Sequence, residues 1–79
     1  MSTQSMPQLL GRRRFEFVQG SSNKFWEISI QGSDVVVVFG RIGTAGQTNR
    51  KSFATAEQAA RDADKLIREK THKGYIDSV

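Results

Sequence analysis

The chain has 79 residues and a formal net charge of +4, with 12 Lys and Arg against eight Asp and Glu. This length fits one small domain, which buries only about 60% of the surface that its unfolded chain exposes. The chain has no cysteine and a single histidine, His72. Disulfides, cysteine-based metal sites and any site that needs two imidazoles are therefore excluded.

The positive charge is distributed unevenly along the chain. Residues 1–54 hold seven basic and three acidic residues, whereas residues 55–79 hold five of each. A field of this sign favours polyanions as partners, nucleic acid first among them.

The first eleven residues are polar, lack a hydrophobic period and contain a proline. We expect them to form a flexible leader ahead of a single domain over residues 12–79. They also lack the basic segment and apolar core of a signal peptide. The longest apolar run, residues 35–39, is far shorter than the roughly 20 residues of a spanning helix. We therefore expect a cytoplasmic protein with no membrane partner.

Residues 14–18 and 25–30 alternate between apolar and polar side chains, which predicts two half-buried β-strands. The two phenylalanines of the first stretch share one side, and Trp26 shares one side of the second stretch with two isoleucines. Residues 20–23 have the composition of a turn. The pattern is typical of a hairpin with its apolar side against a core.

Residues 35–39 are five consecutive apolar side chains, four of them valine. This run favours a third strand that is covered on both faces. We expect Val36 and Val38 to face the helix-covered core, which would place Phe39 and Arg41 on the opposite face.

Residues 47–53 alternate weakly and predict a fourth strand, and from Ala54 onward the period becomes 3.6. Thr55 and Gln58 fit a capping box, and Gly74 fits the end of the helix. We therefore expect an α+β fold, a small antiparallel sheet of about four strands with one long helix packed across one face. The expected core comprises Phe15 or Phe17, Trp26, Ile28, Val36, Val38, Ala60, Ala63, Leu66 and Ile67.

The residue types that carry catalysis form no recognisable set. A serine triad would require His72 to reach the sheet, and nothing in the spacing of the serines at positions 29, 33 and 52 indicates this. The carboxylates of the helix are spread among bases, as on a solvated face. We therefore expect no enzymatic activity, no cofactor and no metal. These carboxylates are Glu57, Asp62, Asp64 and Glu69.

The segment 40–46 has a glycine at every third position, but it matches neither a dinucleotide-binding motif nor a P-loop. Its backbone amides could cradle a phosphate oxygen, or the glycines could simply allow a positive φ in a tight turn. Phe39 and Arg41 lie two residues apart and so share a side of their strand. They could form a platform for a base with a clamp for a phosphate, or Phe39 could fill a minor cluster at the sheet edge.

Residues 38–47, Val-Phe-Gly-Arg-Ile-Gly-Thr-Ala-Gly-Gln, resemble the signature of the WGR domain, which is named for Trp-Gly-Arg. Residues 23–28 resemble the aromatic strand ahead of that signature. Phe53 and residues 69–75 resemble the closing segment of the family. The three pieces occur in the family's order and cover about residues 13–76.

This resemblance implies a small antiparallel sheet with a helix across it. In eukaryotic poly(ADP-ribose) polymerases the domain helps to bind a DNA break, its Trp packing on the terminal nucleotide and its Arg contacting DNA or neighbouring domains. By position, Phe39, Gly40 and Arg41 take the places of the three signature residues. Because Phe offers less area than Trp and no N–H donor, the resemblance implies weaker binding of DNA ends. A chain of 79 residues also leaves no room for a transferase domain.

We therefore expect a non-catalytic module that binds nucleic acid, with DNA favoured over RNA. The alternative is a protein–protein interaction module that docks on a partner enzyme through Phe39 and Arg41 and binds no nucleic acid. The expected nucleic-acid contacts are Phe39, Gly40, Arg41, Lys24, Lys51, Arg50, Arg12, Arg13 and Arg14.

Overall fold

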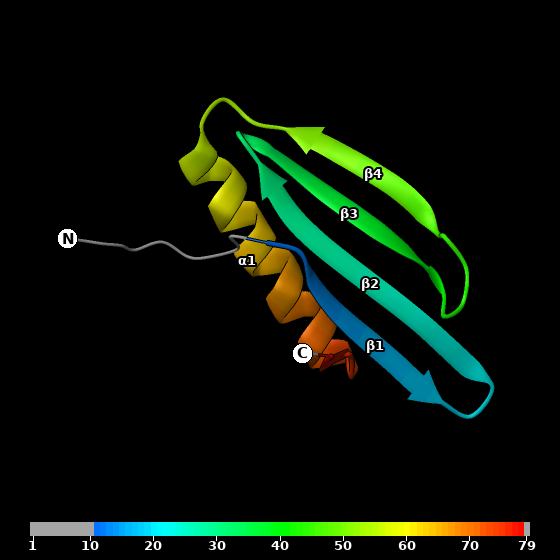
Figure 1. Cartoon of the computed structure of the whole chain (residues 1–79). Coiled ribbons are helices and arrows are strands. Elements are labelled where there is room, and N and C mark those ends of the chain that lie inside the picture. Colours follow the sequence, from blue (N-terminus) through cyan, green and yellow to red (C-terminus); the bar gives the residue numbers. More distant parts are fainter. Residues whose placement is uncertain (1–10, 79) are drawn as a thin grey trace.

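The computed structural model describes residues 11–78, so the expected leader lies outside the described residues except for Gly11. One antiparallel sheet and one helix make up the fold, which confirms the expected α+β class (Figure 1). The elements are β1 (Arg13–Gln19), β2 (Ser22–Gln31), β3 (Asp34–Arg41), β4 (Gln47–Ser52), α1 (Ala56–Lys73) and β5 (Ile76–Asp77).

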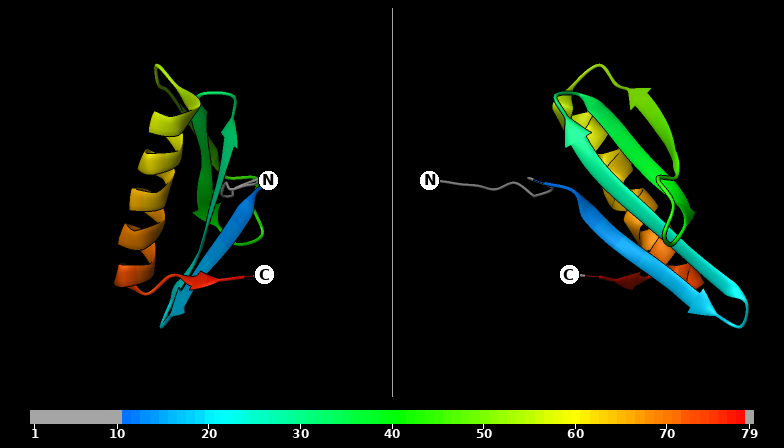
Figure 2. Two further views of the ribbon diagram at one scale, coloured as in Figure 1. Left: turned by 90° about the vertical axis from the view of Figure 1, so that its left-hand side faces the viewer. Right: turned by 45° about the vertical axis from the view of Figure 1, so that its right-hand side comes forward.

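The strands lie in the order β4-β3-β2-β1-β5, and each neighbouring pair runs antiparallel. The fifth strand was not predicted, because two residues after a helix carry no alternation that could reveal a strand. It pairs with β1, so the chain end after α1 returns to the sheet edge. Figure 2 shows that α1 covers one face of the sheet and leaves the other face free of helix.

The core lies between this helix and the sheet. Its buried members are Phe15, Trp26, Ile28, Val35, Ala59 and Ala63, with Leu66, Ile67 and Phe39 among the half-buried side chains packed against them. The alanines on the inner side of α1 are small, which allows the helix to lie close to the sheet. Burial of this apolar surface supplies most of the driving force for a domain of this size.

The predicted orientation of the third strand was wrong. Val35, and not Val36, faces the helix, because β2 and β3 pair Ile30 with Val35 and Trp26 with Phe39. Val36 is also buried, but on the opposite face, where Val38 is half-buried. An uninterrupted apolar run has no alternation, so the sequence pattern does not reveal which side chains point to which face.

The helix begins and ends as its sequence predicted. The Thr55 side chain accepts a hydrogen bond from the Gln58 amide at 3.1 Å, and the Gln58 side chain accepts one from the Ala54 amide at 3.2 Å. Gly74 ends the helix in the left-handed region, with φ 113°. No helix in the described part of the chain is both long and apolar enough to cross a membrane.

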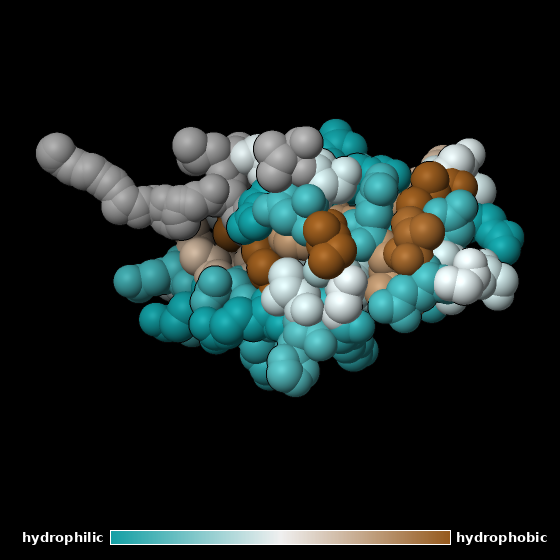
Figure 3. Space-filling model, turned by 90° about the horizontal axis from the view of Figure 1, so that it is seen from below, coloured by the Kyte–Doolittle hydropathy of each residue, from teal (hydrophilic) through white to brown (hydrophobic). Residues whose placement is uncertain are grey.

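Large hydrophobic side chains are sparse on the surface formed by residues 11–78. Among the described residues, Val18 and Ile76 are the large apolar side chains that are mostly exposed. In the space-filling view from below, apolar groups form small patches between hydrophilic ones (Figure 3).

Candidate functional site

The glycines of the signature segment close a loop over an aromatic ring. A Cβ on Gly40 would lie 2.9 Å from the Gly46 Cα, and a Cβ on Gly46 would lie 2.7 Å from the Phe25 ring. Gly43 and Gly46 also have positive φ, of 97° and 78°. The loop therefore packs against buried Phe25 on the face of the sheet away from α1, and its glycines meet steric and conformational demands.

The signature side chains lie on the helix-covered face, and not on the opposite face as expected. Phe39 is paired with Trp26, and Arg41 is paired with Lys24 in the next row of the same face. Phe39 is half-buried and packs against the core, whereas Arg41 is exposed at the end of β3. The pairing of β2 with β3 that places Val35 on the helix-covered face also places Phe39 and Arg41 there.

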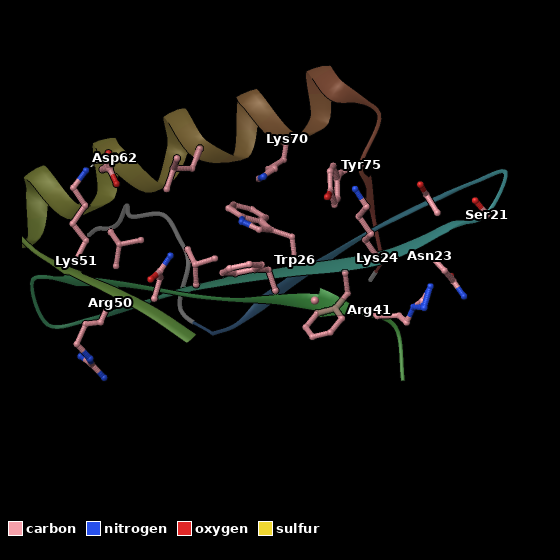
Figure 4. Close-up of a pocket in the computed structure, with 18 residues that line it drawn as sticks. Ser21, Asn23, Lys24, Trp26, Arg41, Arg50, Lys51, Asp62, Lys70 and Tyr75 are labelled. Carbon is pink, nitrogen blue, oxygen red and sulfur yellow. Dashed lines mark ion pairs between the residues drawn. The ribbon is translucent and has the colours of Figure 1, made fainter. Parts of the chain in front are cut away.

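A groove of about 940 Å³ lies along one side of α1, between Asp62, Leu66 and Lys70 of the helix and strands β2, β3 and β4. Its walls combine aromatic and aliphatic side chains with charged ones, as Figure 4 shows. The residues that matter for the site are Lys24, Trp26, Phe39, Arg41, Lys51, Asp62, Leu66, Lys70 and Tyr75. A concave space that combines aromatic and aliphatic side chains with charged ones is a suitable form for a ligand site.

One end of the groove gathers cations around aromatic rings. The Lys70 ammonium lies 5.6 Å from the centre of the Trp26 ring and 5.3 Å from that of Tyr75. Lys24 lies 5.9 Å from the ring centre of Phe17, which itself stacks on Tyr75 at 5.2 Å. Figure 4 shows Lys24 and Lys70 reaching into the space between sheet and helix from opposite sides.

The electrostatics of this end favour an anion. Burial lowers the pKa of Lys70, and the positive charges of Lys73 and Lys24 lower it further against the opposing effect of Glu69. Within residues 11–78, Lys24, Arg41 and Lys70 make no ion pair with a carboxylate. A phosphate placed among them would relieve the repulsion between the ammonium groups.

The other predicted phosphate contacts are occupied within the protein. Arg12 and Arg14 both bind Glu27, at 3.2 and 2.7 Å, and the Arg14 guanidinium lies 4.5 Å from the centre of the Phe25 ring. These partners come from neighbouring strands of the sheet face that α1 leaves free.

The remaining basic side chains of the prediction are also paired. Arg13 binds Asp77 at 2.7 Å, Arg50 binds Asp34 at 2.7 Å, and Lys51 lies 3.9 Å from Asp62. The site therefore brings together Lys24, Phe39, Gly40 and Arg41 from the predicted set. Lys51 lies at the far end of the groove, and the Arg50 side chain points away from it (Figure 4).

Five residues of the site were not among the predicted contacts: Trp26, Asp62, Leu66, Lys70 and Tyr75. Trp26 was assigned to the core, which is correct, since it is only 4% exposed, but it also lines the groove. Lys70 follows Leu66 by four residues, so it continues the edge of the apolar stripe of α1. That spacing is the signal that could have placed Lys70 near the sheet.

Asp62 was expected on a solvated face, and this prediction was wrong. Its side chain is only 17% exposed and points from α1 toward β4. The reason is again helical spacing, because Asp62 lies four residues before Leu66 on the stripe that borders the sheet. Among the described residues, no three His, Cys, Asp or Glu side chains lie close enough together to hold a metal ion.

Comparison with known proteins identifies the family. The model of the WGR domain matches residues 11–79, so the chain belongs to the WGR domain family. It is 39% identical over 64 residues to "Uncharacterized protein YfeS" and 40% identical over 65 residues to "Protein YehF", both from Escherichia coli (strain K12). These matches cover 81% and 82% of the chain but only 26% and 24% of the relatives, so the chain spans about a quarter of their length.

A solved structure has the same fold. The crystal structure of a protein from Bacteroides fragilis superposes with a TM-score of 0.86 at 46% sequence identity. The match covers 87% of this chain and 20% of the other. Sheet order and helix placement therefore recur in a chain that is much longer than this one.

Proposed function

We propose that this WGR domain is a non-catalytic module that binds nucleic acid at the cationic end of the groove. We define this end, the cationic end, as Lys24, Arg41 and Lys70 together with the rings of Trp26, Phe39 and Tyr75. Strand ends of DNA are the proposed ligand, because a terminal nucleotide can leave the duplex and enter a groove that a closed duplex cannot.

The observation that carries the proposal is the distribution of available charge. Lys24, Arg41 and Lys70 line the groove and have no carboxylate partner in residues 11–78, whereas Arg12, Arg13, Arg14 and Arg50 are paired. Cations that are not neutralised inside the protein are the ones that displace counterions from a phosphate backbone.

The aromatic rings at this end provide a second kind of contact with a nucleotide, in addition to the contacts with its phosphate. Phe39 and Tyr75 are half-buried and line the groove beside the buried Trp26, and a sugar or base can pack against such exposed ring surface whatever its sequence. Phe39 contributes from inside the groove, and not from the open face of the sheet. A nucleotide that contacts it must therefore enter between α1 and β3.

The proposal includes no catalysis, and the arrangement of the candidate groups supports this. Ser29 and Ser52 belong to the face of the sheet that lacks the helix, because their strand neighbours Ile28 and Lys51 pair with residues of the helix-covered face. His72 is exposed in the last turn of α1. The sheet thus separates these serines from the imidazole.

Titration of fluorescently labelled DNA tests the proposal. The probes are blunt, nicked and single-stranded oligonucleotides, with and without a terminal phosphate, together with a closed circle of similar length. We expect Arg41→Ala and Lys24→Gln each to weaken binding and to reduce the salt slope by about 1, since each change removes one phosphate contact.

Arg13→Gln is the matched control, because it removes the same formal charge from a side chain that is paired with Asp77. We expect it to leave the salt slope nearly unchanged, and circular dichroism of each variant verifies the fold. If the folded Arg41 and Lys24 variants bind all probes as the parent does, nucleic-acid binding at this site is refuted. Docking on a partner protein then becomes the better interpretation of the exposed Arg41.

A further inference from the structure

The end of the groove opposite the cationic end contains an acceptor with no donor. The Asp62 Oδ2 atom is buried and has no hydrogen-bond partner among the described residues. Its Oδ1 atom lies 3.9 Å from the Lys51 ammonium, which is at the limit of an ion pair. Leaving a buried carboxylate oxygen without a hydrogen-bond donor costs free energy. A ligand that supplies a donor at this position would remove that cost.

The two ends are connected by a single stripe of the helix. Asp62, Leu66 and Lys70 recur every four residues along α1, and all three line the groove. From Asp62 to Lys70 the helix rises about 12 Å. Cations therefore lie at one end and apolar and aromatic side chains in the middle, while the other end holds the Asp62 carboxylate with the Lys51 ammonium 3.9 Å from it (Figure 4).

This order of groups matches one nucleotide with its base unpaired. The phosphate is an anion, and the sugar and the base offer apolar or flat surfaces. On most bases, the edge farthest from the phosphate carries N–H donors. Cytosine, adenine and guanine each present an amino group on the Watson–Crick edge. Thymine presents one ring N–H between two carbonyl oxygens, whose partial negative charges repel a carboxylate.

We propose that Asp62 is a specificity-determining residue that accepts a hydrogen bond from the amino group of an unpaired base held in the groove. The domain should then discriminate against thymine at an unpaired strand end. This inference rests on the proposed function, because the base reaches Asp62 only if its phosphate is held near Lys24, Arg41 and Lys70. It adds a preference among bases, which phosphate contacts alone do not supply.

The experiment uses duplexes with a one-base 5′ overhang, identical except that the unpaired base is dC, dA, dG or dT. Quenching of the Trp26 fluorescence reports binding, because Trp26 is the sole tryptophan and lines the groove. We expect the dT probe to bind at least about fivefold more weakly than the dC probe, the lower range for a direct base contact.

Asp62→Asn then removes the preference. The amide presents an N–H donor in addition to its oxygen, so it can pair with a thymine carbonyl. We expect the dC and dT affinities of this variant to agree within about twofold. Asp64→Asn is the matched control, since Asp64 is an exposed carboxylate on the same helix, paired with Arg68 at 2.7 Å. It should raise the affinity for all probes alike and keep the preference.

The outcomes separate the two proposals. Equal binding of the four probes by the parent protein overturns the role of Asp62 and leaves nucleic-acid binding intact. A preference that survives in a folded Asp62→Asn variant overturns it as well. If no probe binds to the parent protein, the proposed function and this inference both fail. Melting curves verify that each variant is folded, and the comparison of probes on the parent protein requires no variant.

Discussion

The two faces of the sheet carry the same kinds of residue and use them differently. On the face that α1 leaves free, Arg14 lies over Phe25 and is bound by Glu16 and Glu27, whose hydrogen bonds raise the pKa of Arg14. On the helix-covered face, Lys70 lies over Trp26 with no carboxylate partner in the described chain, and burial lowers its pKa. The first arrangement holds the sheet together, and the second leaves a charge available for a ligand.

This difference shows why a net charge of +4 is a poor guide to a binding surface. Most of the arginines that produce the excess are neutralised by partners across the strands. Among the described cations without an ion pair, Lys24 and Arg41 come from residues 1–54, whereas Lys70 comes from residues 55–79, whose net charge is zero. The pairing of the cations, as well as their number, therefore shapes the field that an anion meets.

The largest effect is expected where the helix-covered face is most tightly packed. Ile28 is fully buried between sheet and helix, so Ile28→Ala should lower the free energy of unfolding by about 2–5 kcal/mol. For a small domain this is a large part of the total stability. Leu66→Ala should cost less, because Leu66 is only half-buried at the edge of the groove. Urea unfolding measures both, and an equal loss would contradict the assignment of Leu66 to the edge.

We expect the stability of the protein to depend also on the loop of residues 40–46, which packs on the face of the sheet that α1 leaves free. A Cβ on Gly46 would lie 2.6 Å from the Phe39 carbonyl oxygen and 2.7 Å from the Phe25 ring, at a φ of 78°. We expect Gly46→Ala to cost about 1–3 kcal/mol, from strain and from displacement of Phe25.

Gly43→Ala is the matched control, because φ is 97° there but no atom lies within 4 Å of the added Cβ. It should show only the smaller conformational penalty. Thermal unfolding distinguishes the two variants, and equal melting temperatures would mean that the loop does not pack on Phe25 as described.

A smaller effect is expected for a substitution in the groove, and it concerns the affinity for DNA ends. Phe39→Trp introduces the residue that the family signature carries and enlarges the ring in the groove. We expect DNA ends to bind more tightly by about 1 kcal/mol or less, as a fraction of one base–aromatic stack. The gain should be larger for a linear duplex than for a closed circle.

Phe53→Trp is the control, because Phe53 packs against the same core but is not among the residues that line the groove. It should leave the affinity unchanged. Equal changes in both variants would mean that Phe39 acts through packing and does not contact the ligand.

The smallest effect concerns Lys70 and pH. Its pKa in the folded protein is lowered from 10.5, so just below that value the unfolded chain binds more protons than the folded one. The free energy of unfolding should therefore rise as pH increases through this alkaline range. Lys70→Gln should lack that rise, which urea unfolding at several pH values measures. The same slope in parent and variant would place the Lys70 ammonium in solvent, as on an ordinary exposed helix face.

The helix and both of its ends could be predicted from the sequence pattern. Its 3.6-residue period, the capping threonine at position 55 and the glycine at position 74 are local signals, and the structure confirms each of them. The strands alternated clearly where polar residues interrupted the apolar ones, as in β2. The pattern was uninformative in β3, where five consecutive apolar side chains hide the alternation.

The predicted site was only partly correct, because the orientation of the β3 side chains was not predicted correctly. The signature residues 39–41 were found by resemblance, but their orientation depended on the register of β3. A hairpin with Gly32 and Ser33 as its two-residue turn would have predicted that register, since it places Val35 opposite Ile30. A turn one residue longer would move every side chain of the strand to the other face.

The sequence by itself determined the class of fold, the helix and its ends, and the family, because these depend on local periodicity and on a contiguous motif. Only the tertiary structure decided which cations are available. Arg12 meets Glu27 across 15 residues and Arg13 meets Asp77 across 64, while Lys24 and Lys70 line one groove and neither is paired with a carboxylate of residues 11–78. Such pairings follow from strand register and from the angle at which the helix crosses the sheet, and no local pattern encodes either.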